Sequence, residues 1–190
     1  MTAPLTLLQS VDLLGRYRYV ELAAFERLGR RAPECSHAGV ATFLAQASLA
    51  HAWRARLFEE RLPVSVGLPD AAASTRSPGS FLDEALDELV GPGEGAAGDP
   101  ELLDALLGAL YPSMLAGYAS RLEVASPSAD PPVVLALGRA TADLERIAAA
   151  GLRLVRAGAS GPPPPAARRD RVATMLDAGG GAFGPLLRRP

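Results

Sequence analysis

Apolar residues recur at three- and four-residue spacing along most of the chain, which is the period of an amphipathic α-helix. The first such segment covers residues 5–31, and its apolar face includes Leu14, Tyr17 and Leu28. A second segment covers residues 40–61 after only a short linker. Such a short linker predicts that these two helices are antiparallel neighbours.

The second half of the chain repeats this hairpin pattern after a long connection. Proline and glycine interrupt residues 62–100, where one short helix is predicted over 80–90. Further helices are expected over 100–124 and 132–157, with a short turn between them. Pro112 falls inside the third long helix and should kink or split it. The predicted fold is all-α, a four-helix bundle with a long crossover between its second and third helices.

Composition supports a helical core and argues against several classes of partner. Hydrophobic residues make up 48% of the chain and aromatic residues only 5%, so alanine and leucine must fill the interior. The net charge of −2 gives no support for nucleic-acid binding. By sequence, no apolar stretch reaches the length needed for a membrane span, and no secretory signal is recognised at the N-terminus. The single cysteine, Cys35, fits a reducing compartment, so we expect a cytoplasmic protein without a membrane partner.

The C-terminal part, residues 158–190, differs in kind from the predicted bundle, which covers residues 1–157. A run of four prolines reads as an extended spacer and predicts a flexible tail. Within the tail a short amphipathic helix is predicted over 168–178, and Phe183 follows a triple glycine. Two interpretations stay open: a disordered chain end, or a tethered peptide over 168–190 that docks on a partner protein.

Polar side chains interrupt the predicted apolar faces at a few positions. Glu21 lies one helical turn from Tyr17, and His51 holds an equivalent place in the second helix. A buried carboxylate requires a hydrogen-bonding, charged or metal partner, because its desolvation is costly. In the last long helix, Asp143 and Glu145 lie near the inner face. Together these residues form the candidate metal-ligand set.

The segments around the first two of these residues carry a family resemblance. Residues 19–28 read YVELAAFERL, and residues 43–63 read FLAQASLAHAWRARLFEERLP. They resemble the first hairpin of bacterial ferritin-like proteins. The resemblance implies a ferritin-like bundle over residues 10–156. That superfamily holds two iron ions with one Glu on each of two helices and a Glu-x-x-His on each of the others. It implies that Glu21 matches the Glu of the first helix and His51 the His of the second.

The sequence lacks the rest of that two-iron ligand set. Ser48 stands at the position of the second helix's Glu, and a hydroxyl is a poor iron ligand. Three residues beyond Asp143 and Glu145 stand Arg146 and Ala148, neither of which is histidine. The resemblance therefore predicts a degenerate di-iron site.

Two states of this site are considered. Glu21, His51 and one acid of the last helix would suffice for a single iron or manganese ion. Alternatively, a hydrogen-bonded Glu–His pair, tied to Arg146 or Tyr118, satisfies both groups without a cofactor, and this interpretation is preferred.

Three functions follow from these alternatives. The first is a non-catalytic ferritin-like protein that acts through binding. The second is a non-heme iron or manganese oxidoreductase with an irregular ligand set. The third is a helical adaptor or shell-cargo protein that docks through its C-terminal tail. Whether the chain is an enzyme is thus left open. Alanine-rich helix faces also predict a homo-oligomer, of undetermined stoichiometry.

Overall fold

The computed structural model describes residues 6–91, 98–125, 128, 130–157 and 166–185. It is all-helical over these residues, as predicted, and contains no strand among them. The elements are α1 (Leu7–Arg31), η1 (Ala32–Glu34), α2 (Ala38–Glu59), α3 (Ala71–Ser74), α4 (Ser80–Val90), α5 (Gly98–Ala105), η3 (Leu106–Leu110), α6 (Tyr111–Val124), α7 (Pro131–Arg156) and α8 (Ala167–Ala178).

The predicted helices agree with the structure to within two residues at each end. Local capping explains two of the boundaries. Thr6 and Gln9 form a reciprocal capping box at the start of α1. His37 precedes α2, and its Nδ1 accepts a hydrogen bond from the N–H of Gly39 at 3.1 Å. The short helix α3 was not predicted.

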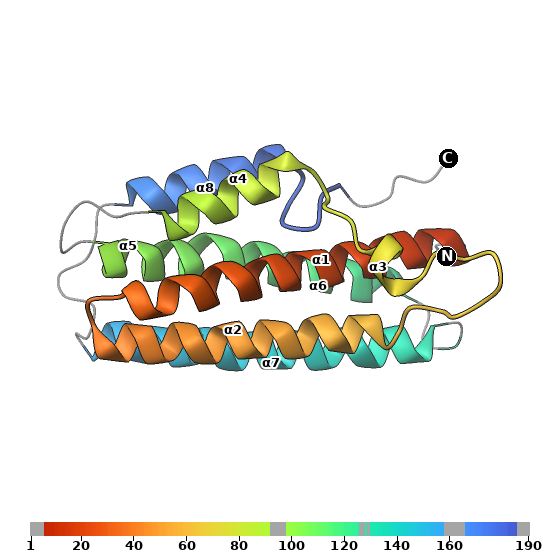
Figure 1. The fold of residues 1–190 in the computed structure, drawn as a ribbon, viewed down its shortest axis with the longest axis horizontal. Coiled ribbons are helices and arrows are strands. Elements are labelled where there is room, and N and C mark those ends of the chain that lie inside the picture. The colour runs from red at the N-terminus through yellow and green to blue at the C-terminus, as the bar shows by residue number, and fades with distance from the viewer. Residues whose placement is uncertain (1–5, 92–97, 126–127, 129, 158–165, 186–190) are drawn as a thin grey trace.

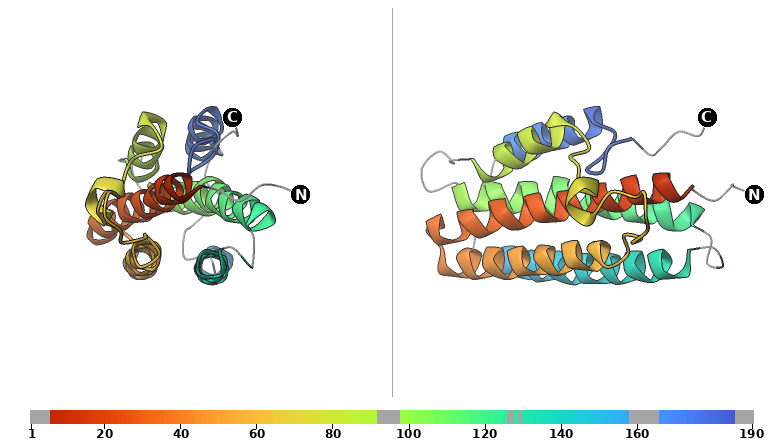
Figure 2. Two further views of the ribbon diagram at one scale, coloured as in Figure 1. Left: turned by 90° about the vertical axis from the view of Figure 1, so that its right-hand side faces the viewer. Right: turned by 45° about the vertical axis from the view of Figure 1, so that its right-hand side comes forward.

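The helices lie in layers that the end-on view of Figure 2 separates. One layer contains α2 and α7, and the next contains α1 and the continuous α5–η3–α6 segment. Across and within these layers α1 packs on α2, α2 on α7, and α6 on α7. On the far side α4 and α8 pack against each other and cover α1 and α5, as Figure 1 shows. No described element covers the outer face of α2 and α7 in this way.

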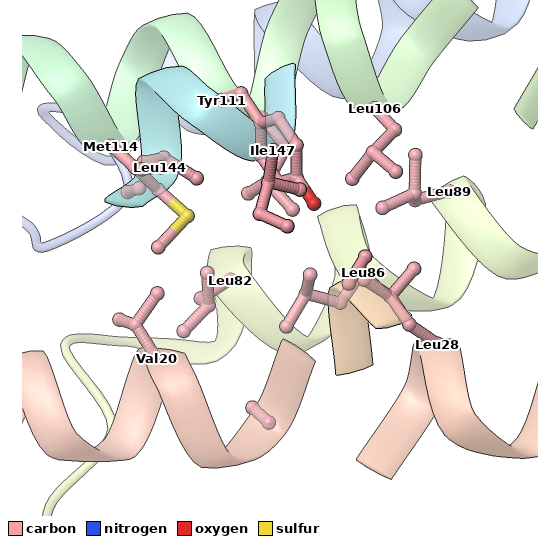
Figure 3. Packing of buried hydrophobic residues seen from close by; sticks show 14 of the residues in the cluster. Val20, Leu28, Leu82, Leu86, Leu89, Leu106, Tyr111, Met114, Leu144 and Ile147 are labelled. Carbon is pink, nitrogen blue, oxygen red and sulfur yellow. The ribbon is translucent and has the colours of Figure 1, made fainter. Parts of the chain in front are cut away.

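Aliphatic side chains meet between these layers, as the composition predicts. Val20 and Leu28 of α1 lie opposite Leu82 of α4, Met114 of α6 and Leu144 of α7 (Figure 3). All five side chains are fully buried. Their burial ties α4 to the long helices, so the segment between α2 and α5 contributes to the core and is more than a connection.

Pro112 is accommodated by a change of helical type. The segments α5, η3 and α6 follow one another without interruption, and η3 is a π-helical turn. At its end the N–H of Tyr111 donates to the carbonyl of Leu106, five residues earlier. Because proline has no N–H to donate, a wider turn next to it limits the disruption. The predicted kink or split is therefore a π turn within a continuous helix.

The same continuous segment corrects one expectation about apolar length. Gly98–Val124, with 27 residues and a mean hydropathy of 1.3 in its most apolar window, is long and apolar enough by length and composition to cross a membrane. Half of that window is buried inside the protein. A central core helix passes the same test, so the burial accounts for this composition.

Within the predicted tail over 158–190, the structure describes residues 166–185, which contain a helix and a turn. The predicted short helix is present as α8, and it buries Val172 and Leu176 against the body. The run of prolines and residues 186–190 lie outside the described residues. Most of the predicted tail is thus part of the folded protein.

A turn after α8, residues 179–185, returns the chain to the core and is called the C-terminal turn below. Gly180, Gly181 and Gly184 have φ of +81°, +94° and +75°, in the left-handed region that favours glycine. The turn places Phe183 inside the protein with 5% of its surface exposed. The glycines that suggest flexibility in sequence are required here by backbone conformation.

Candidate functional site

Glu21 of α1 and His51 of α2 meet in the interior, as predicted. The Nδ1 atom of His51 lies 2.5 Å from Oε2 of Glu21. Both side chains are fully buried. The antiparallel pairing of α1 and α2 brings the middle of one apolar stripe against the middle of the other.

Arg54 is the residue of this site that sequence reasoning misses. Its Nε donates to Oε1 of Glu21 at 2.8 Å, and a terminal nitrogen donates to Oδ2 of Asp143 at 2.5 Å. The Arg54 side chain is fully buried. One guanidinium thus bridges carboxylates from α1 and α7. The available signal is its spacing, since Arg54 follows His51 by three residues and shares its helix face.

Tyr118 of α6 completes what we call the polar centre, which consists of Glu21, His51, Arg54, Tyr118 and Asp143. The Tyr118 hydroxyl donates to Oε1 of Glu21. Burial raises the pKa of Tyr118 well above its usual value, so the hydroxyl keeps the proton that it donates. Of the two partners predicted for the Glu–His pair, Tyr118 is confirmed. Arg146 bonds Asp143 instead, at 2.7 Å.

The Glu21 carboxylate is ionised in this environment. Burial alone would raise its pKa, but the charges of Arg54 and His51 and their hydrogen bonds outweigh burial and lower the pKa to about 2. Since Arg54, Tyr118 and His51 all contact the carboxylate oxygens, its hydrogen-bonding capacity is largely used.

The surroundings of His51 disfavour protonation of its ring. Burial, followed by the positive charge of Arg54, lowers the pKa of His51 despite the nearby Glu21. Its Nδ1 atom lies 2.5 Å from a carboxylate oxygen of Glu21 and 2.9 Å from a terminal nitrogen of Arg54, so the first contact calls for a protonated Nδ1 and the second for an acceptor. The other ring nitrogen, Nε2, is buried and has no hydrogen-bond partner among the described residues. The nearest ring is that of Tyr111, at 5.7 Å between centroids.

The remaining predicted ligands lie apart or are occupied. Glu145 is exposed on α7 and is not part of the polar centre. Ser48 donates to the carbonyl of Phe25 at 2.8 Å. A Cβ atom at Gly29 would lie 2.8 Å from the Ser48 hydroxyl, so the two helices are in close contact here. A glutamate at position 48 has no room in this packing.

The arrangement does not fit a resident metal ion. No group of three or more His, Cys, Asp or Glu side chains within the described ranges could hold one. The guanidinium of Arg54 lies between Glu21 and Asp143, at the position where a cation would be needed. A second cation beside it would be repelled. We therefore derive no metal-dependent step from these residues.

An aromatic cluster adjoins the polar centre and shares Tyr118 with it. The rings of Tyr17 and Phe58 lie 5.1 Å apart, and Phe183 packs edge-on to Tyr17 at 4.6 Å. Phe183 also stacks on Tyr118 at 4.9 Å. We call Tyr17, Phe58, Tyr118 and Phe183 the aromatic cluster. It connects the C-terminal turn to the residue that donates to Glu21.

Comparisons of the whole chain with protein families, with curated proteins and with solved structures find no match. The ferritin-like resemblance therefore depends on the sequence segments 19–28 and 43–63 alone. The functional argument depends on the geometry of the polar centre and on the surfaces around it.

Proposed function

We propose that this chain is a non-catalytic binding protein on a ferritin-like frame, in which Arg54 replaces the metal. The observation that carries the proposal is the double contact of its guanidinium with Glu21 and Asp143. An arginine neutralises two carboxylates as a metal ion does, but it cannot change its oxidation state or bind oxygen. On this proposal the degenerate site stabilises the fold, and the protein acts by binding through its surface.

The order and pairing of the helices support the frame. The α1–α2 hairpin and the α6–α7 pair are separated by a long segment that contains α3 and α4. Glu21 and His51 occupy the positions that the ferritin-like resemblance assigns to ligands, and they touch. A cytoplasmic location, favoured by the single cysteine, is part of this proposal.

Metal analysis of the purified full-length chain tests the proposal. We expect iron and manganese well below one ion per chain after expression in medium supplemented with both metals. Stoichiometric metal that is lost in Glu21→Gln would overturn the proposal and favour the oxidoreductase alternative. The exposed substitution Glu145→Gln is the matched control, because it removes a carboxylate outside the polar centre.

The docking-tail alternative depends on Phe183 being available to a partner. Phe183 is enclosed by Tyr17 and Tyr118 and is not available to a partner while the C-terminal turn is in place. The part of the predicted tail that is described packs inward through α8. A partner surface is therefore better sought on the long helices.

We also propose that the bare outer face of α2 and α7 pairs with a second copy of the chain. On α2, Leu49 is 68% and Trp53 46% exposed. At 1.5 Å per residue the 22 residues of α2 span about 33 Å, and two adjacent helices present about 700 Å². Specific, stable interfaces bury about 600–1,000 Å² on each partner, so this face falls within that range.

Light scattering during size-exclusion chromatography measures this pairing. We expect a dimer for the wild type and a monomer for Leu49→Glu and Trp53→Glu. Val66→Glu is the control, since Val66 is fully exposed in the loop after α2. Trp53 is the only tryptophan, so its emission should also shift to shorter wavelength as the concentration rises. A wild-type monomer at all concentrations would exclude the second copy.

A further inference from the structure

A pocket opens on the opposite side of the molecule, between α6, α8 and the C-terminal turn. Its volume is about 410 Å³, within the range of pockets that hold small organic molecules. Small and apolar side chains form much of its wall, including Pro112 and Ala116 of α6 and Ala173 of α8. Tyr17 and Phe183 of the aromatic cluster also line it. The polar centre does not line it.

The charge of the pocket lining is negative. Asp177 is its only Asp, Glu, Arg or Lys side chain. Asp177 stands in the last turn of α8, which contains no basic residue. The helix dipole places partial negative charge at this end of α8, and the N–H groups of Gly179, Gly180 and Gly181 donate to carbonyls of its last turn. Asp177 forms no ion pair with the rest of the described chain.

Two arginines come near the pocket, but acidic partners hold both of them. Arg16 approaches Gly184 and pairs with Asp12 at 2.8 Å. Arg169 lies over Gly108 and contacts Asp104 at 3.5 Å and its neighbour Asp170 at 3.3 Å. Neither arginine lines the pocket. An anionic ligand would therefore meet Asp177 without a free counter-charge.

We propose that this pocket binds a small organic cation, a protonated amine on a compact apolar body. The ammonium group pairs with Asp177 and the end of α8, and the apolar body packs against Pro112 and Ala116. The combination of one carboxylate and an apolar wall selects a single positive charge next to hydrocarbon. The inference rests on the proposed binding role and names a ligand class for it.

Three probes of matched size test the charge preference on the full-length protein. They are 2-phenylethylamine, 2-phenylethanol and 3-phenylpropionate, which are cationic, neutral and anionic at pH 7. Titration followed by ligand-observed NMR should give the amine about fivefold higher affinity than the carboxylate, the size expected for a contact with an exposed carboxylate such as that of Asp177. Equal affinities for all three probes would overturn the proposal.

Two variants place the binding in the pocket. Asp177→Asn should remove the preference for the amine over the alcohol, while the control Glu145→Gln keeps it. Ala116→Trp should fill the pocket and weaken all three probes at least tenfold, and its exposed position makes folding tolerant of the change. Amine binding that survives both variants would place the site elsewhere. Metal analysis tests the proposed function, and the probe titrations test ligand binding in the pocket, so either proposal can fail without the other.

Discussion

The polar centre and the aromatic cluster lie on either side of Tyr118 and are stabilised in different ways. In the polar centre, Arg54 and Glu21 are fully buried charges that depend on each other. In the aromatic cluster, Phe183 depends on shape, because it fits against a helix position that has no side chain. The first region tolerates no single loss of charge, whereas the second tolerates no added volume.

The difference shows how the C-terminal turn and the interior are coupled. Tyr118 donates to Glu21 through its hydroxyl and stacks on Phe183 through its ring. A loss on either side therefore reaches the same residue. Substitutions that separate charge from volume distinguish the two regions.

Loss of Arg54 should have the largest effect. Arg54→Met leaves Glu21 buried without its main counter-charge, and we expect the free energy of unfolding to fall by about 3–5 kcal/mol. The double variant Glu21→Gln with Arg54→Met should lose less than Arg54→Met alone, because no uncompensated carboxylate remains on α1. Chemical denaturation measures both values.

The control for this comparison lies on the same helix. The side chain of Arg56 is 78% exposed and, among the residues that the structure describes, pairs with Glu60 alone, so Arg56→Met should change stability by less than about 1 kcal/mol. A similar loss for Arg54→Met and Arg56→Met would show that the polar centre is not a dry, charge-paired site.

Phe183→Ala tests the aromatic cluster and should follow in size. Removing a buried phenylalanine destabilises a core by about 3 kcal/mol or more, since both contacts and volume are lost. We also expect faster proteolysis after α8, because the C-terminal turn loses its anchor. Val66→Ala, at a fully exposed position, is the control. Unchanged stability would mean that the turn does not pack on Tyr17 and Tyr118 in solution.

Acid should weaken the polar centre selectively. The pKa of Glu21 is lowered to about 2 from 4.5, so its contribution is complete above pH 4.5 and is lost as the pH falls toward 2. The pKa of His51 is also lowered, so protonation below about pH 6.5 opposes folding as well. Denaturation at a series of pH values should show stability falling in both ranges. Glu21→Gln should remove the lower one, and an unaltered profile in that variant would contradict the assignment.

The sequence predicts the helices and the meeting of Glu21 with His51, because both depend on local periodicity and on a short linker. It does not reveal Arg54, since an arginine next to an apolar stripe is normally a solvated residue. Its burial is explained by its contacts with Glu21 of α1 and Asp143 of α7, which come from distant parts of the chain. The C-terminal turn was missed for a related reason. Glycines in a sequence suggest freedom, and the contact of Phe183 with Gly117 is not visible until α6 and the turn are placed together.

A substitution at Gly117 should have the smallest effect on stability, and it changes side-chain volume without changing charge. A Cβ atom at Gly117 would lie 2.4 Å from the Phe183 ring, so Gly117→Ala should destabilise the protein by about 1–3 kcal/mol through overpacking. The gain in helix propensity from alanine offsets about 1 kcal/mol of this. Combining it with Phe183→Leu, which removes the clashing ring edge, should restore part of the loss. Additive losses in the double variant would mean that the two residues are not in contact. In Gly117→Ala and in its combination with Phe183→Leu, the pH dependence assigned to Glu21 should be unchanged, because neither substitution alters a charge.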